Sequence, residues 1–437
     1  MRAKQDLPRT YTVTIERLSH EGRGVARYQG KTVFVADALP GEEVVAKVTR
    51  RHRRFDEAAT VEILRADPAR VTPRCPYATV CGGCSFQHLD PTSQLAHKEQ
   101  VLLELLRHQA GVIPERVLPQ ITGPLWGYRR RARLSVRVVP KKGGTLIGFR
   151  EKASHYVTAI EHCAVLVPSV GLRLTELRGV LDALSIPEHI PQIEVIADDT
   201  VTVLVIRHLM ALHEADLAIL REFECATGLR IYLQAGATAL AAPLTTPVAL
   251  SYRVGGIEYG FGPGDFVQVN AVINAELIAT ALTLLAPAAD DTVLDLFCGV
   301  GNFTLPLAQH AGRVVGVEHA PSVVARARDN AARNEISNVE FVSADLFAAS
   351  ALAALPQQSF QRVLLDPPRT GAEVALRALD LAATQRVLYI SCNPVTLARD
   401  AAILIRERGF RLSAAGVIDM FPHTAHVESI AVFDRAR

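Results

Sequence analysis

Three side chains capable of chemistry stand after runs of apolar residues in the last third of the chain. Asp366 opens an Asp-Pro-Pro-Arg motif and Cys392 lies in Ser-Cys-Asn-Pro, each after a run typical of a buried strand, and Glu428 follows near the C-terminus. The carboxyl ends of parallel strands meet at one edge of a sheet, where ligands bind. We therefore expect Asp366, Cys392 and Glu428 to share one site.

This combination suits methylation of carbon 5 of a uracil base, a carbon too weakly nucleophilic to take a methyl group unaided. Addition of the Cys392 thiolate to carbon 6 would create an enolate, and a base must later remove the carbon 5 proton so that the cysteine can leave. Cys392 is the predicted nucleophile, Glu428 the predicted base, and Asp366 could hydrogen-bond the uracil edge. A buried structural thiol and a surface glutamate are the plainer alternatives for the first two.

Neighbouring enzyme classes fit these motifs less well. Methyltransferases that act on amino groups place an aromatic residue after Asn/Asp-Pro-Pro and need no cysteine, whereas Arg369 stands at that position here. Cytosine-specific DNA methyltransferases carry their nucleophile in a Pro-Cys context at the fourth strand, whereas Cys392 follows the fifth. The motifs therefore favour uracil as the target.

A cofactor site is predicted where residues 292–304 read as a buried strand, a glycine turn and a helix. Glu318 ends the next apolar strand and could accept hydrogen bonds from both ribose hydroxyls. Asp345 follows a third strand and could meet the adenine edge. Thr304 replaces the third glycine of the dinucleotide fingerprint, so the pattern resembles the class I fold of S-adenosylmethionine-dependent methyltransferases more than other Rossmann-like enzymes.

Four of the seven cysteines are candidates for a metal centre. Cys75, Cys81 and Cys84 form C-x5-C-x2-C with two glycines between the last pair, and Cys163 is a plausible fourth ligand. Four thiolates suit zinc or an iron–sulfur cluster, and the spacing alone does not choose between them. Unligated thiols are the remaining alternative.

The whole chain has the composition of a soluble protein of roughly three domains. It has 437 residues, of which 49% are hydrophobic and 21% are charged. No stretch reaches the roughly 18 apolar residues of a membrane span, and the N-terminus lacks the apolar core of a signal peptide. We expect a cytoplasmic monomer with no membrane partner.

The elements that must position the reactive side chains fall into three predicted domains. Residues 1–70 hold about five short strands, the size of an OB-like β-barrel that binds RNA. Residues 71–92 and 125–262 form a central, mostly-β domain with the four cysteines. Residues 263–437, with 93–124, alternate apolar strands with helical stretches, which predicts an α/β domain with a mostly parallel sheet.

Positive charge is concentrated at the front of the chain, although the net charge is only +2. Residues 1–74 carry 15 basic and 10 acidic groups, a net +5, and residues 125–152 carry 9 basic groups and one acid, a net +8. The remainder is therefore −11. This distribution suits a polyanion such as RNA, with solvated faces as the alternative. The cluster best suited to phosphate contacts is Arg50, Arg51, Arg53 and Arg54.

Jointly, these motifs resemble the RNA 5-methyluridine methyltransferase family, in its 23S rRNA branch. The matching segments are DLFCGVGNFT from Asp295, DPPR from Asp366, SCNP from Ser391, the late His-x-Glu ending at Glu428, and the cysteine segment. The resemblance covers essentially the whole chain, and the N-terminal barrel resembles a TRAM domain.

The resemblance implies an enzyme that methylates carbon 5 of a specific uridine in 23S rRNA, with Cys392 as nucleophile and Glu428 as base. Phe266, in the family's F-x-Q-x-N element, would stack on the flipped base. A [4Fe-4S] cluster is implied on Cys75, Cys81, Cys84 and Cys163. S-adenosylmethionine contacts are implied from Gln268, Phe297, Asn302, Glu318, Asp345 and Asp366.

Several alternatives stay open at this point. The tRNA branch of the family is expected to lack the N-terminal barrel and the cluster cysteines, so we expect rRNA as the substrate. Some bacteria use one barrel-bearing enzyme for two rRNA uridines, which the sequence does not exclude here. A non-catalytic RNA-binding or chaperone protein is a different class, and intact Cys392, Glu428 and Glu318 weigh against it.

Overall fold

The computed structural model describes residues 9–352 and 359–436, which divide into two compact units. The first unit comprises the chain up to Val101 with two short later stretches, Glu151–Ser154 and Pro422–His426, and the second unit comprises the remainder. The predicted barrel and methyltransferase domains each extend beyond the described residues. Residues 1–8 of the predicted barrel lie outside the described residues, as do residues 353–358 and 437 of the predicted methyltransferase domain.

The first unit is built around a six-stranded sheet in the order β1-β5-β6-β4-β3-β2. Its pairs are antiparallel except for β4 with β6. Tyr11 and Val13 are buried while the threonines on either side of each are exposed, the period of two expected of a strand with one face in a core. The strands are β1 (Thr10–Thr14), β2 (Arg17–Leu18), β3 (Gly24–Tyr28), β4 (Lys31–Ala36), β5 (Glu43–Arg51) and β6 (Phe55–Arg65).

Beyond this sheet, the first unit holds the cysteine-bearing loop and the beginning of helix α1 (Pro91–Leu105). The backbone carbonyl of His423 accepts hydrogen bonds from the amides of Ser85 and Phe86, both at 2.9 Å. The amide of His423 donates to the side chain of Gln94 at 2.9 Å, across 329 residues of sequence. A segment from the far end of the chain therefore completes this unit.

The second unit contains a mixed six-stranded sheet in the order β13-β12-β11-β10-β8-β9. A β-hairpin connects it in sequence to the last part of the chain. The strands are β8 (Arg131–Val139), β9 (Gly144–Gly148), β10 (Gln192–Ala197), β11 (Thr202–His208), β12 (Arg230–Ala235), β13 (Ala242–Pro243) and, in the hairpin, β14 (Leu250–Val254) and β15 (Ile257–Phe261). The helices are α2 (Pro168–Gly171), α3 (Leu174–Asp182) and α4 (Glu214–Thr227).

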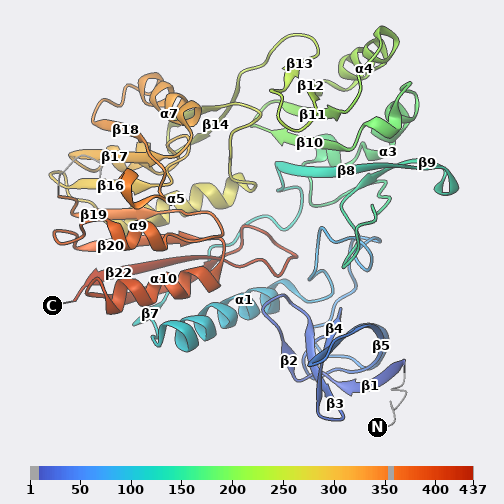
Figure 1. The fold of residues 1–437 in the computed structure, drawn as a ribbon, viewed down its shortest axis with the longest axis horizontal. Helices are drawn as coiled ribbons and strands as arrows, with labels where there is room; N and C mark the ends of the chain where they lie inside the picture. Colours follow the sequence, from blue (N-terminus) through green and yellow to red (C-terminus); the bar gives the residue numbers. More distant parts are fainter. Residues whose placement is uncertain (1–8, 353–358, 437) are drawn as a thin grey trace. The chain divides into compact units, whose positions relative to one another are not determined.

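The same unit contains an eight-stranded sheet in the order β18-β17-β16-β19-β20-β22-β21-β7 (Figure 1). Strands β18, β17, β16, β19 and β20 are parallel to one another, and β22 is antiparallel to its neighbours. This confirms the mostly parallel α/β sheet expected for this region. The strands are β7 (Arg116–Val117), β16 (Thr292–Leu296), β17 (Arg313–Glu318), β18 (Val339–Ser343), β19 (Arg362–Leu365), β20 (Arg386–Ser391), β21 (Phe410–Ile418) and β22 (Glu428–Arg435).

Helices pack on this sheet through apolar side chains. Ile273 and Leu277 of α5 and Leu307 of α6 join one buried cluster with the strand residues Leu364 and Leu388. The remaining helices are α5 (Ala271–Leu285), α6 (Thr304–Ala308), α7 (Pro321–Arg333), α8 (Ala349–Leu352), α9 (Glu373–Ala378) and α10 (Pro394–Arg406). In the described part of the chain, no helix combines the length and apolar character needed to cross a bilayer.

Candidate functional site

The carboxyl end of β16 opens into a tight turn that leads to α6. Phe297 adopts φ 64°, a left-handed conformation that is costly for an aromatic residue, and Gly299 and Gly301 follow with φ 55° and 94°. Strained backbone of this kind gathers at functional sites. The switch in strand order between β16 and β19 also lies here, where open α/β sheets bind ligands.

Glu318 ends β17 beside this turn, as the sequence predicts. Its carboxylate accepts hydrogen bonds from the amides of Gly299 at 3.3 Å, His319 at 2.7 Å and Ala320 at 3.2 Å. The amides hold the acid at the start of the loop into α7. A ribose at the glycine turn would meet this fixed acceptor.

A hollow opens at the same sheet edge. It brings together four of the six residues predicted to contact the cofactor, which are Gln268, Phe297, Asn302 and Asp366. Phe266 also lines it and is 70% exposed, so its ring is accessible for stacking. The mixed apolar and polar lining suits a small organic ligand.

Two residues that hydrogen-bond to Asn302 carry no recognisable motif and were missed by the sequence analysis. Tyr252 of β14 donates its hydroxyl hydrogen to the side-chain oxygen of Asn302 at 2.9 Å. Asn274 of α5 exchanges two side-chain hydrogen bonds with Asn302, each at 3.0 Å. Asn302 is thereby fixed by a hairpin and a helix.

Asp345 lies after β18 but turns toward the backbone. Its carboxylate accepts a hydrogen bond from the amide of Phe347 at 2.9 Å, in a position outside the residues that line the hollow. Phe347 is exposed and packs against Phe297 with ring centroids 5.8 Å apart. The aromatic pair flanks the turn after β16. The adenine contact assigned to Asp345 remains a prediction.

The three reactive side chains converge at the ends of β19, β20 and β22. Ser391 pairs with Ser429 in antiparallel register, which places Glu428 beside the end of β20 where Cys392 follows. The pKa of the Cys392 thiol is raised to about 12, mainly by burial and then by the negative charges of Glu428 and Asp366, whereas Arg369 lowers it. Cys392, Glu428 and Asp366 therefore lie near one another at this edge of the sheet.

Carboxyl groups crowd this edge of the sheet. The pKa of Asp366 is raised well above its ordinary value by burial, by Glu428 and by Asp295. Burial and the charge of Glu318 raise the pKa of Asp295 to about 7, although Thr304 donates a hydrogen bond to it at 2.6 Å. Such a cluster disfavours further negative charge and attracts a cation. Asp295 is a further residue that the sequence analysis did not single out.

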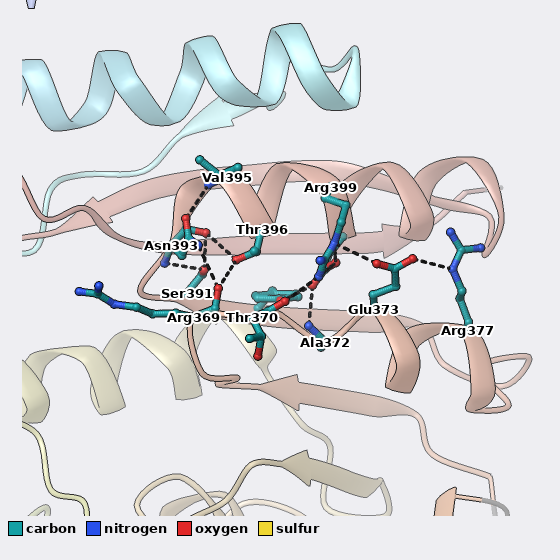
Figure 2. A network of polar contacts seen from close by, with 12 residues as sticks. Arg369, Thr370, Ala372, Glu373, Arg377, Ser391, Asn393, Val395, Thr396 and Arg399 are labelled. Atoms are coloured by element: carbon teal, nitrogen blue, oxygen red, sulfur yellow. Dashed lines mark hydrogen bonds and ion pairs between the residues drawn. The ribbon is translucent and has the colours of Figure 1, made fainter. Parts of the chain in front are cut away.

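The turn that carries Cys392 is tied to the Asp-Pro-Pro-Arg loop, as Figure 2 shows. The side-chain nitrogen of Asn393 donates to the carbonyl of Arg369 at 2.9 Å, and its oxygen accepts from the amide of Val395 at 3.1 Å, capping α10. The hydroxyl of Ser391 accepts from the amide of Asn393 at 3.1 Å. The two loops form one hydrogen-bonded unit.

The four cysteines predicted to hold a metal centre are divided between the two units. Cys81 and Cys84 are buried and Cys75 is half-buried, all in the first unit, and the amide of Gly83 donates to the sulfur of Cys81 at 3.4 Å. Cys163 is buried in the second unit. Within residues 9–352 and 359–436, no group of three or more His, Cys, Asp or Glu side chains is arranged to hold a metal ion. The cluster therefore remains a prediction.

Part of the basic stretch 125–152 is committed to the protein's own structure. Arg130 pairs with Asp199 at 2.5 Å and Arg131 pairs with Glu194 at 2.9 Å. Arg131 also donates to the carbonyls of Pro263, at 3.2 Å, and Asp265. Because both carbonyls lie within the three residues before Phe266, Arg131 supports the loop that leads to the hollow.

Comparison with known proteins finds close relatives. The family model described as tRNA (uracil-5-)-methyltransferase matches residues 248–436, and the TRAM domain model matches residues 7–61. The chain is 51% identical to the 23S rRNA (uracil(1939)-C(5))-methyltransferase RlmD of Alkalilimnicola ehrlichii, with 99% of each chain covered. It is 48% identical to the protein of the same name from Stenotrophomonas maltophilia, again with 99% of each chain covered.

A solved structure shares the overall fold. The tRNA (uracil-54, C5)-methyltransferase of Pyrococcus abyssi, in complex with S-adenosyl-L-homocysteine, matches with a TM-score of 0.74 at 23% identity. The match covers 97% of this chain and 99% of that chain. The predicted methyltransferase fold and TRAM domain are confirmed. The expectation that tRNA enzymes lack the N-terminal domain is wrong as a general rule, because this match spans nearly the whole chain.

Proposed function

Because the chain belongs to the RlmD family of 23S rRNA (uracil-C5)-methyltransferases, we propose that it transfers a methyl group to carbon 5 of one uridine in 23S rRNA. The observation that carries the proposal is the convergence of Cys392, Glu428 and Asp366 at one sheet edge beside the hollow. A nucleophile, a base and a carboxyl group are the groups that methylation at this carbon requires.

We propose that the hollow holds S-adenosylmethionine, which supplies the methyl group. Glu318 accepts the ribose hydroxyls, Phe297 and Phe347 flank the adenine, and Gln268, Asn302 and Asp366 line the remainder. The carboxyl groups Asp295 and Glu318 support this proposal, because a sulfonium cation bound near them offsets their mutual repulsion. Asp345 is proposed to meet the adenine edge on the basis of the family resemblance.

The chemistry proposed for the chain's own residues proceeds in three steps. The Cys392 thiolate bonds to carbon 6 of the uracil, and the electrons of the 5,6 double bond move onto the ring as an enolate. Carbon 5 then takes the methyl group as the donor's carbon–sulfur bond breaks. Glu428 removes the proton from carbon 5, the double bond re-forms, and the cysteine leaves.

Asp366 and Arg369 are proposed to assist these steps. The raised pKa of Asp366 favours its protonated form, which donates a hydrogen bond to a uracil oxygen and supports the enolate. Arg369 lowers the pKa of the Cys392 thiol and so favours the attacking thiolate. Phe266, exposed at the rim, offers a stacking surface for the flipped base.

We also propose that Cys75, Cys81, Cys84 and Cys163 hold a [4Fe-4S] cluster. The support is an all-thiolate donor set, the glycine pair that permits a tight loop, and the amide hydrogen bond to the sulfur of Cys81. The assignment of Cys163 as the fourth ligand rests on the family resemblance. No step of the methyl transfer is assigned to the cluster.

We propose that the TRAM domain binds RNA. We also propose the division of the chain into residues 1–70, a central domain and a methyltransferase domain. Mapping 5-methyluridine by mass spectrometry in rRNA and tRNA of a strain lacking the gene tests the proposed function. Loss at one position of 23S rRNA is expected. Loss at two rRNA positions would indicate a dual-site enzyme, and loss only in tRNA would overturn the assignment.

A further inference from the structure

We propose that Asp400 is a positioning residue for the methyl transfer: from helix α10, it fixes the loop of residues 366–372 beside the turn that carries Cys392. The inference rests on the proposed function and extends it to a residue that touches neither the base nor the cofactor hollow.

Asp400 is a buried carboxylate in a position where an apolar residue would pack. It is 0% exposed, and its helix neighbours Leu397, Ala401 and Leu404 are buried and apolar. A charged group in such surroundings costs stability unless hydrogen bonds satisfy it. The retention of an acid at this point of the helix therefore calls for an explanation beyond packing.

The hydrogen bonds of Asp400 join the two halves of the catalytic edge. One carboxylate oxygen accepts from the hydroxyl of Tyr389 at 2.6 Å and from the amide of Ala372 at 2.7 Å. Tyr389 lies on β20 three residues before Cys392, and Ala372 ends the loop that begins at Asp366. A single oxygen of Asp400 thus connects β20, the strand that precedes Cys392, to the loop that begins at Asp366.

Arg399 extends the connection to the middle of the loop. Its guanidinium donates to the other oxygen of Asp400 at 2.8 Å and to the carbonyl of Thr370 at 2.9 Å. Figure 2 shows Arg399 reaching from α10 toward the segment of Thr370 and Ala372. With the bond from Asn393 to the carbonyl of Arg369, the loop is held at three points, namely Arg369, Thr370 and Ala372.

Gly371 gives independent evidence that the loop must lie against this carboxylate. It has φ 78°, which disfavours any side chain. A Cβ at Gly371 would lie 2.6 Å from Asp400 Oδ2 and 2.5 Å from a guanidinium nitrogen of Arg399. The loop therefore has no room to move closer and loses its hydrogen bonds if it moves away.

The consequence is a fixed geometry between Cys392 and the loop groups Asp366 and Arg369. Asp400→Ala should lower kcat by about 100-fold, the scale expected from a small misplacement of reacting groups. Cofactor affinity and the KM for RNA should change little. Asp400→Asn keeps one acceptor for Tyr389 and Ala372 and should recover much of the activity.

The test measures kcat, KM, cofactor affinity and the rate of covalent attachment to RNA carrying 5-fluorouridine at the target position. Fluorine at carbon 5 cannot be removed as a proton, so attachment reports the attack by Cys392 and the methyl transfer without the final elimination. Asp400→Ala should slow attachment. Glu407→Gln, at the far end of α10 and paired with Arg377, is the matched control and should behave as wild type.

If Asp400→Ala folds only in part, the folded fraction still binds the cofactor. If kcat then falls only in proportion to that fraction, and the folded protein attaches to the RNA at the normal rate, Asp400 has a purely structural role. Tyr389→Phe and Gly371→Ala probe the same connection if Asp400→Ala does not fold, and normal attachment rates in both would overturn the proposal. Absence of attachment and methylation by wild type on any 23S rRNA fragment would instead overturn the proposed function.

Discussion

Glu428 begins β22 directly beside the point where Cys392 leaves β20. The antiparallel pair of Ser391 and Ser429 fixes this relationship, since one further step along each strand reaches the two reactive residues. The backbone register therefore sets the separation of the proposed base and nucleophile, independently of any loop.

Replacing Cys392 with alanine should abolish turnover while leaving cofactor binding nearly intact. The thiol is proposed to attack the base, and Cys392 is outside the residues that line the cofactor hollow. We expect a loss on the order of 10,000-fold in methyl transfer, with an unchanged cofactor dissociation constant. Cys225→Ala, which removes an exposed thiol, is the control. Substantial methylation by the Cys392 variant would refute covalent catalysis.

Glu428→Gln should trap the methylated covalent complex, because elimination of the cysteine requires removal of the carbon 5 proton. An RNA–protein band that survives denaturation should accumulate with the amount of enzyme, and turnover should fall by about 100-fold or more. Combining this change with Cys392→Ala should remove the band. Normal turnover by Glu428→Gln would assign the base to another group.

Affinity for S-adenosylmethionine should rise with pH through the titration of Asp295. Its pKa is raised to about 7, so the carboxyl is neutral in acid and negatively charged above neutrality, when it attracts the sulfonium. Below that pKa, affinity should increase by up to about tenfold per pH unit and then level off. S-adenosylhomocysteine carries no charge on sulfur and should show a weaker dependence. Equal pH profiles by calorimetry for both ligands would contradict this electrostatic account.

Protein purified without oxygen should be brown and contain iron and sulfide. Cys81→Ser should lose iron, because it removes a proposed thiolate ligand, whereas Cys225→Ser should keep it. Metal analysis and visible absorbance provide the measurement. Stoichiometric zinc in protein produced with ample iron and without oxygen would overturn the cluster assignment.

Neutralising Arg50, Arg51, Arg53 and Arg54 should weaken binding to large rRNA fragments and flatten its dependence on salt. All four are exposed at the end of β5 and in the turn that follows. Each lost phosphate contact should reduce the slope of log affinity against log salt by roughly 0.7 to 0.9. Turnover at saturating RNA should change little.

The matched control for this salt titration neutralises two arginines that pair with acids elsewhere on the surface. Arg173 pairs with Glu176 at 3.0 Å, and Arg221 pairs with Glu214 at 2.5 Å. Their loss should leave the slope unchanged. If the quadruple variant also keeps the wild-type slope, the arginine cluster is only a solvated face.

The sequence predicted those parts of the site that follow strands in short motifs. Cys392 and Asp366 stand directly after β20 and β19, and a parallel sheet brings such strand ends together whatever its helices do. The roles of Tyr252 and Asn274 were not predicted, because each contacts Asn302 only after a hairpin and a helix have folded against the turn. Their contacts depend on tertiary packing, which has no fixed spacing in sequence.

The basic stretch 125–152 shows a second limit of prediction from the sequence. Counting charge over residues 125–152 predicts a phosphate-binding surface, yet Arg131 is used to brace the loop before Phe266. Composition reports how many cations are present, whereas their partners depend on which strand lies alongside. Asp400 illustrates the same point, because only the folded loop shows what its carboxylate connects.

The hydrogen bonds between His423 and the segment that follows the cysteines have a consequence for the order of events during synthesis. Ser85 and Phe86 leave the ribosome more than 300 residues before their partner, so their amides stay without this acceptor until that segment has been synthesised. Contacts at such sequence separation form late and slowly. A nascent chain that ends before Pro422 lacks the segment that bonds to Ser85 and Phe86, so this part of the first unit cannot be completed until that segment has been synthesised.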